Sequence, residues 1–250
     1  MIAVEPGGNR GAFTDRLFTI GTNFLQSTVI RYRVRMLAEK YIQRPGLRVN
    51  QDFLRQMNEL GLTPERLWWG PMTLFPQKAQ FLLSEIEKHP PKRILEIGSG
   101  TSSALFAALA VKHNFTMLSL DNYKDTMKYV QSILEGIPCD NRVRLQQCGL
   151  IRRSYPNGKK YWWYDAILDD KQGLFDFVFI DGPMSSLVGR NGALPEIKPY
   201  LAKDHRIYID DYNRAHEKAC VTEWGRHFPG LIVETFEECK GVALLKLPNI

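Results

Sequence analysis

The chain has 250 residues, of which 44% are hydrophobic and 24% charged, with a net charge of +6, as in an ordinary globular protein that can bury a full core. No apolar run approaches the roughly 20 residues that cross a bilayer, and residues 1–16 lack a signal-peptide pattern, so we expect a cytoplasmic protein without a transmembrane segment. The four cysteines form no Cys-x-x-Cys pair, which argues against a zinc site or a disulfide framework.

The N-terminal segment is helical in pattern and basic. Residues 1–14 are rich in glycine, and an apolar stripe predicts a helix over residues 15–42. Residues 1–92 hold 13 Lys and Arg against 8 Asp and Glu, so they carry +5 of the net charge of +6. These charges fit a solvated helix face, a nucleic-acid contact, an acidic membrane surface or an acidic partner. We expect residues 1–74 to be a helical extension that serves as a cap, in partner docking or in homodimer formation.

Shorter elements follow. The pattern predicts a helix over residues 51–60, another helix start at Thr63-Pro64, and an amphipathic helix over residues 77–89. Between them, Trp68 and Trp69 either cover the core or form a wall over a ligand.

The stretch from Arg93 to Leu109 combines a buried strand, a Gly-Ser-Gly turn at residues 98–100 and a helix. Glycines let a backbone approach a ligand closely, and a helix N-terminus offers free N–H groups. The stretch is therefore typical of a nucleotide-type cofactor loop, although ordinary tight turns also contain Gly-x-Gly.

Strands and helices then alternate to the end of the chain. Strands are expected at residues 115–120, 143–148, 175–180 and 205–209, and helices at 127–134, 194–201 and 214–228. Two closing strands, 231–236 and 242–247, are expected to form an antiparallel hairpin. This order predicts an α/β domain over residues 75–250, with a doubly wound, mostly parallel seven-stranded sheet and an antiparallel C-terminal strand. Ligands of such sheets bind beyond the carboxyl ends of the strands.

Asp121 ends the second strand, about twenty residues after the glycine turn. A carboxylate at this place can accept both ribose hydroxyls of an adenosine cofactor, or it can cap the next helix. Together, the loop and the acid indicate an adenosine-containing ligand.

The ordered features resemble the class I S-adenosylmethionine-dependent methyltransferases. Leu-Glu-Ile-Gly-Ser-Gly-Thr at 95–101 matches their first motif, and Ser103 stands where a dinucleotide loop would carry a third glycine. Asp121 stands where these enzymes place the acid that binds the ribose, and Asp181-Gly-Pro183 stands where they place the motif of the fourth strand. The C-terminal hairpin matches their closing antiparallel strand. The resemblance covers about residues 75–248. Residues 163–165, 180–183 with Arg190, and 210–211 with Arg214 are similar to a bacterial subgroup, often of unassigned substrate.

The resemblance implies a set of contacts with S-adenosylmethionine. Gly98, Ser99 and Gly100 would pass beneath its amino-acid part, and Glu96 would organise that loop. Asp121 would hold the ribose and Asn122 would lie near the adenine. The adenine pocket would be lined by Cys148, Gly149 and Leu150, whereas Asp181 would lie near the transferred methyl group.

Three acids at strand ends are the candidate catalytic residues: Asp181, Asp210 and Asp211. In the catechol-type O-methyltransferases, groups at these strand ends hold a magnesium ion that polarises the acceptor hydroxyls. The same three acids are therefore candidate ligands of Mg²⁺. Gly182-Pro183 and the second acid at 210–211 depart from that family, so Asp210 or Asp211 could instead pair with Arg190 or Arg214, or cap the last long helix.

Residues 151–174 form an insertion that contains five aromatic residues, Tyr155, Tyr161, Trp162, Trp163 and Tyr164, among basic ones. It is predicted to be a surface loop with aromatic anchors, or a lid over the acceptor. The function predicted from these features is methyl transfer from S-adenosylmethionine to a small-molecule acceptor, at a hydroxyl oxygen. A nucleic-acid methyltransferase that docks through the basic segment, and a non-catalytic scaffold that binds the cofactor, remain alternatives.

Overall fold

The computed structural model describes residues 51–69, 73–139, 141–155, 157–168, 173–184, 188–236 and 241–248. The lead-in predicted at residues 1–14 and the helix predicted over residues 15–42 lie outside this part of the chain. Among the helices it does describe, none is both long and apolar enough to cross a membrane.

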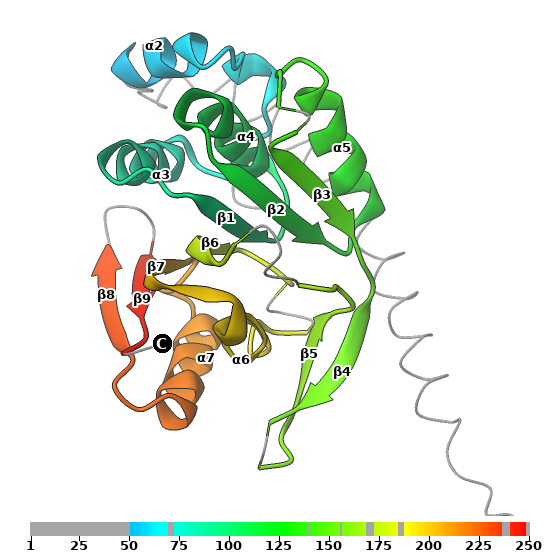
Figure 1. The fold of residues 1–250 in the computed structure, drawn as a ribbon, viewed down its shortest axis with the longest axis vertical. Coiled ribbons are helices and arrows are strands. Elements are labelled where there is room, and N and C mark those ends of the chain that lie inside the picture. The colour runs from blue at the N-terminus through cyan, green and yellow to red at the C-terminus, as the bar shows by residue number, and fades with distance from the viewer. Residues whose placement is uncertain are drawn as a thin grey trace, which may run out of the picture.

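A seven-stranded sheet forms the centre of the molecule, in the order β3-β2-β1-β6-β7-β9-β8 (Figure 1). Its strands are β1 Arg93–Ile97, β2 Thr116–Asp121, β3 Val143–Gln147, β6 Phe175–Ile180, β7 Leu201–Ile209, β8 Ile232–Phe236 and β9 Val242–Lys246. The first five of these run parallel, whereas β9 is antiparallel to both β7 and β8. The predicted doubly wound sheet with its antiparallel closing strands is confirmed.

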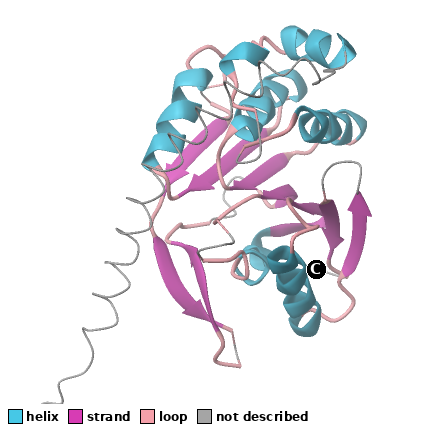
Figure 2. Cartoon of the chain, turned by 180° about the vertical axis from the view of Figure 1, so that it is seen from behind, coloured by secondary structure: helices cyan, strands magenta, loops and turns pink. Residues whose placement is uncertain are grey.

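Helices cover both faces of this sheet (Figures 1 and 2). One face carries α3 Pro76–Lys88, α4 Thr101–His113 and α5 Lys124–Leu134, with α2 Gln51–Glu59 packed outside them. The other face carries α6 Ala193–Ile197 and α7 Ala215–His227. The sheet therefore separates two hydrophobic cores.

Strand β1 shows how the sequence assigns side chains to these two cores. Ile94 belongs to the core under α3 and α4, whereas Leu95 and Ile97 belong to the opposite core. Since side chains alternate along a strand, Glu96 points toward α4 with Ile94. All five β1 residues are buried, so Glu96 is enclosed by protein.

The insertion differs from the predicted loop. It forms a two-stranded antiparallel ribbon of β4 Leu150–Ser154 and β5 Lys160–Tyr164. Its five aromatic side chains are buried, and they pack into the core on the α6 and α7 face. Tyr155, for example, stacks on His227 with ring centroids 4.3 Å apart. The aromatic residues therefore anchor the ribbon to the domain.

The described part of the N-terminal segment packs into the core under α3 and α4, through Phe53, Met57, Leu62 and Leu67. The helix start predicted at Thr63 is a single 3₁₀ turn, Pro64–Arg66, and the Thr63 side chain makes no capping hydrogen bond. The roles predicted for residues 1–74 in docking or dimer formation stay predictions.

Candidate active site

A cavity opens at the carboxyl ends of the parallel strands, where β1 and β6 lie side by side and the strand order reverses. Four parts of the chain meet there: the loop after β1, the end of β2, the loop after β6 and the end of β7. Among the residues that line it are Gly98, Ser99, Gly100, Thr101, Asp121, Asp181 and Asp211. The cavity therefore brings the predicted cofactor loop and two of the three predicted catalytic acids, Asp181 and Asp211, into one space.

The floor of the cavity is a close crossing of two backbones. Gly98 has a φ of +97°, and a Cβ atom there would lie 2.7 Å from the backbone nitrogen of Gly182. A Cβ on Gly182 would lie 2.8 Å from the Cα atom of Gly98 and 2.6 Å from the Tyr164 hydroxyl oxygen. Both positions therefore require glycine, because backbone atoms cannot move aside as a flexible side chain can. Gly100 is different, since a Cβ atom there would have no other atom within 4 Å.

Glu96 lies beneath the glycine loop and organises it. Its carboxylate accepts hydrogen bonds from the hydroxyls of Ser102, Ser103 and Ser119. Burial raises the pKa of Glu96 to about 7, and the three hydroxyl donors oppose that rise. Ser103 also accepts from the amide of Gly100 at 2.9 Å, so its hydroxyl ties the loop to Glu96. A glycine at position 103, as in a dinucleotide loop, would have no hydroxyl to connect Gly100 with Glu96.

Asp121 is 4% exposed and lies against the loop. Its carboxylate accepts from the amide of Ser99 at 2.8 Å and from the amide of Tyr123 at 2.6 Å. Burial raises the pKa of Asp121 to about 7, whereas these amides lower it. Asp121 was also predicted to cap the next helix. It does so in part, because it accepts from the amide of Tyr123, the N-cap residue of α5. The same carboxylate also lines the cavity.

An aromatic wall closes another side of the cavity. Trp68 stacks on Tyr129 with ring centroids 3.6 Å apart and planes 7° from parallel. The Trp68 amide donates to the Tyr129 hydroxyl at 2.7 Å, and the Thr101 hydroxyl donates to the Trp68 carbonyl at 2.5 Å. Trp69 instead packs into the core, edge-on to Phe53. Trp69 thus covers the core, whereas Trp68 lines the cavity, and its role as a wall over a ligand stays a prediction.

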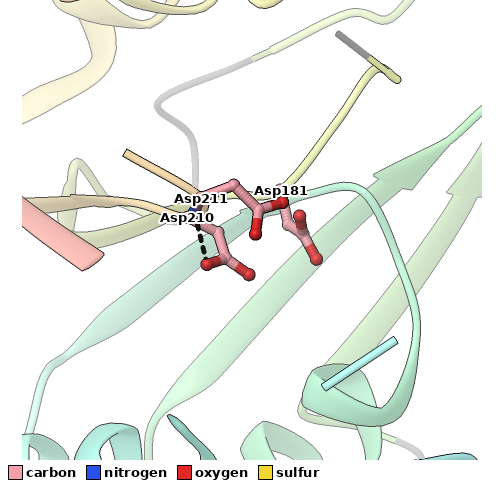
Figure 3. A group of neighbouring side chains, drawn as sticks. All are labelled: Asp181, Asp210 and Asp211. Atoms are coloured by element: carbon pink, nitrogen blue, oxygen red, sulfur yellow. Dashed lines mark hydrogen bonds between the residues drawn. The ribbon is translucent and has the colours of Figure 1, made fainter. Parts of the chain in front are cut away.

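The three strand-end acids come together at the edge of the cavity (Figure 3). The Asp181 amide donates to the carbonyl of Ile97 at 2.8 Å, and the Asp210 amide to the carbonyl of Ile180 at 2.9 Å. These bonds continue the parallel ladders, so the acids follow neighbouring strands. Asp211 has a φ of 58°, and its amide donates to the Asp210 carboxylate at 2.5 Å. One oxygen of each acid lies within 4.8 Å of the others.

Cations of the chain face all three carboxylates. Lys78, from α3, forms an ion pair with Asp210, and both side chains are 2% exposed. Arg190 donates to Asp181 at 2.9 Å, and Arg214 lies 2.8 Å from Asp211. Burial raises the pKa of Asp181 well above its usual range, neighbouring Asp210 adds to the rise, and Arg190 opposes it.

The remaining predicted cofactor residues lie near the cavity without lining it. They are Glu96, Asn122, Cys148, Gly149 and Leu150, and all the other predicted site residues except Asp210 line the cavity. The Cys148 amide donates to the carbonyl of Asp121 at 2.9 Å, so Cys148 is next to the predicted ribose acid. The cofactor contacts assigned to these residues, and to those that line the cavity, stay predictions.

Several cavity residues were absent from the prediction. Thr101, Tyr123 and Tyr129 line it, and Lys78 lies behind it. Tyr129 could not be found from local sequence, because it meets Trp68 across 61 residues. A signal did exist for Lys78, which precedes Leu82 and Ile86 by four and eight residues and therefore shares their buried helix face.

The donor set of the acid cluster suits a hard divalent cation in its chemistry, since it offers three carboxylates. The charges around the cluster do not suit a divalent cation. Two of its neighbours, Lys78 and Arg190, are buried cations already paired with Asp210 and Asp181.

The comparison with known families now decides the class of the protein. A family model described as O-methyltransferase matches residues 48–190. The chain belongs to the O-methyltransferase family. With the fold described above, it is a class I S-adenosylmethionine-dependent methyltransferase. A search of curated proteins finds no match.

Solved structures share the fold of this O-methyltransferase at low sequence identity. An S-adenosylhomocysteine-bound methyltransferase from Podospora anserina is 14% identical, covers 100% of both chains and has a TM-score of 0.50. An O-methyltransferase from Bacillus cereus, also bound to S-adenosylhomocysteine, is 15% identical, with coverage of 82% and 93% and a TM-score of 0.51. TomG from Streptomyces achromogenes, an O-methyltransferase of tomaymycin synthesis, is 13% identical, with coverage of 81% and 90% and a TM-score of 0.51.

Proposed function

We propose that this enzyme transfers a methyl group from S-adenosylmethionine to a hydroxyl oxygen of a small-molecule acceptor. The observation that carries the proposal is the single cavity that joins the glycine loop and Asp121 to the acid cluster at Asp181. A cofactor held on the loop and an acceptor held at the acids would meet inside it.

The loop residues fit the cofactor. The space beside Gly100 is open, so an amino-acid moiety can lie directly on the backbone there. The N-terminus of α4, a helix of 13 residues, starts at the same point and favours a carboxylate. The buried Asp121 carboxylate at the next strand end suits ribose hydroxyls. We propose that these groups bind S-adenosylmethionine, with Glu96 acting through the loop.

S-adenosylmethionine would supply a methyl group on a sulfonium: the acceptor oxygen would attack the methyl carbon in line, and S-adenosylhomocysteine would leave as the carbon–sulfur bond breaks. The chain must then align the acceptor, exclude water and accept the proton of the hydroxyl. Asp181 is placed for the last task. Its side chain is 27% exposed and lines the cavity, and Arg190 fixes one of its oxygens. A positioned base typically contributes about 10²–10⁴-fold to the rate.

A form of this function that uses Mg²⁺ at the three acids is the alternative, because a metal there would polarise the acceptor hydroxyl. It would have to bind beside Lys78 and Arg190. If a metal takes part, EDTA abolishes turnover and Mg²⁺ restores it; turnover that EDTA leaves unchanged excludes this form.

The acceptor class is tested with methyl-labelled S-adenosylmethionine, incubated with a small-metabolite extract or with RNA. We expect label in the metabolite pool as an alkali-stable ether. The Asp181→Asn variant, which keeps the shape but removes the base, should lose this transfer by about 10²-fold or more. Label in RNA would instead support the nucleic-acid alternative. A biological role that survives in Asp181→Ala would support the scaffold.

A further inference from the structure

The acid cluster is neutralised by the chain itself. Lys78 reaches it from α3, on the sheet face opposite α7, and its ammonium contacts the Asp210 carboxylate and lies 3.7 Å from that of Asp211. The ammonium thus lies between two of the three acids. Its side chain is 2% exposed, so few solvent molecules can replace these contacts.

Arg190 holds the equivalent position between the other pair of acids. One guanidinium nitrogen lies 2.9 Å from Asp181 and 3.6 Å from Asp211. The second terminal nitrogen donates to the carbonyl of Asp210 at 2.7 Å. Arg190 therefore joins the carboxyl ends of β6 and β7. The buried Glu217 of α7 lies 3.7 Å behind it and completes its charge balance.

Formal charges can be counted for this group of residues. The acids Asp181, Asp210, Asp211 and Glu217 contribute −4, and Lys78, Arg190 and Arg214 contribute +3. The net charge of −1 balances the single positive charge of a sulfonium. A divalent cation would raise the net charge to +1 before any cofactor binds. It would also lie beside two buried cations, and burial strengthens that repulsion because little water screens it.

We propose that Lys78 and Arg190 are the resident cations of this cluster, that they occupy the place a divalent metal would need, and that methyl transfer here proceeds without one. The last clause rests on the function proposed above. Lys78 and Arg190 are positioning residues: they hold Asp210, Asp211 and Asp181 in place, and Asp181 keeps its role as the base.

The test is a titration of EDTA-treated protein with Mn²⁺, followed by electron paramagnetic resonance. We expect wild type and Lys78→Arg to bind no Mn²⁺ at the cluster, because both keep the cation. Lys78→Met removes the charge from a similar volume, and we expect it to gain one Mn²⁺ site. Its dissociation constant for Mn²⁺ should lie about 100-fold or more below the highest Mn²⁺ concentration at which wild type shows no site. Adding Asp210→Asn to Lys78→Met should remove the gained site.

A matched control is Lys112→Met, which breaks the half-exposed ion pair with Glu87 and leaves the cluster untouched. It should behave as wild type. A wild-type Mn²⁺ site that Asp210→Asn removes would overturn the proposal, and this result stands even if Lys78→Met fails to fold. A folded Lys78→Met that binds S-adenosylhomocysteine but no Mn²⁺ would overturn it as well.

The outcomes that would refute the proposed function differ from those that would refute the metal-free assignment. Its failure would appear as no binding of S-adenosylhomocysteine and no transfer of labelled methyl, whatever the Mn²⁺ titration shows. If both proposals hold, wild type transfers label at a rate that EDTA leaves unchanged. A loss of transfer in EDTA, restored by Mg²⁺, would contradict the metal-free assignment alone.

Discussion

The crossing of Gly98 over Gly182 makes a sharp prediction for the substitution Gly98→Ala. The new methyl group would lie 2.7 Å from the Gly182 nitrogen and 2.8 Å from the Asp181 carbonyl carbon, and both are backbone atoms. It would also occupy a residue with a φ of +97°. An L-residue in a positive-φ conformation costs about 1–2 kcal/mol, and overpacking costs about 1–3 kcal/mol.

These costs predict that Gly98→Ala lowers the free energy of unfolding by about 2–5 kcal/mol. The melting temperature should then fall by roughly 5–15 °C for a chain of this size. Thermal and urea unfolding measure the change. The variant should also lose affinity for S-adenosylhomocysteine, because the loop that moves is the loop proposed to hold it.

Gly100→Ala is the matched control. It lies two residues away in the same loop, with an extended φ of 173° and no atom within 4 Å of the added methyl group. We expect its melting temperature to stay within about 2 °C of wild type. If Gly98→Ala is as stable as Gly100→Ala, the close backbone crossing is refuted.

Two further predictions concern the walls of the cavity. Burial raises the pKa of Asp121 to about 7, and donation from ribose hydroxyls favours the ionised carboxylate, so affinity for S-adenosylhomocysteine should rise with pH. The rise should be about tenfold from pH 6 to pH 8 by calorimetry, and Asp121→Asn should show none. Tyr129→Phe keeps the stack on Trp68 but removes the acceptor of its amide, so urea unfolding should show a loss of about 1–2 kcal/mol. A neutral Tyr129→Phe would argue against this wall.

The fold was predictable from sequence because its signals are local. Apolar runs that end in Asp121, Asp181 and Asp210 indicate parallel strands, and parallel strands bring their ends to one edge. The meeting of these acids with the glycine loop follows from that topology alone. The topology of the sheet does not predict which side chains of distant elements contact one another. The contact of Lys78 with Asp210 spans 132 residues and depends on how α3 lies on the sheet.

The ribbon β4–β5 was harder to predict for a related reason. A strand with one solvated face shows alternating apolar and polar residues in its sequence. The consecutive aromatic residues of β5 do not alternate in this way, because both faces of β5 are covered. Burial of Tyr161 through Tyr164 against α6 and α7 makes those residues structural, and Tyr164 alone among them also lines the cavity.

The most direct test of the account is a calorimetric titration of the full chain with S-adenosylhomocysteine. We expect binding at one site per chain, a strong loss of affinity in Asp121→Ala, and no binding of NAD. Absence of S-adenosylhomocysteine binding by folded protein, or binding of NAD in its place, would contradict the central claim.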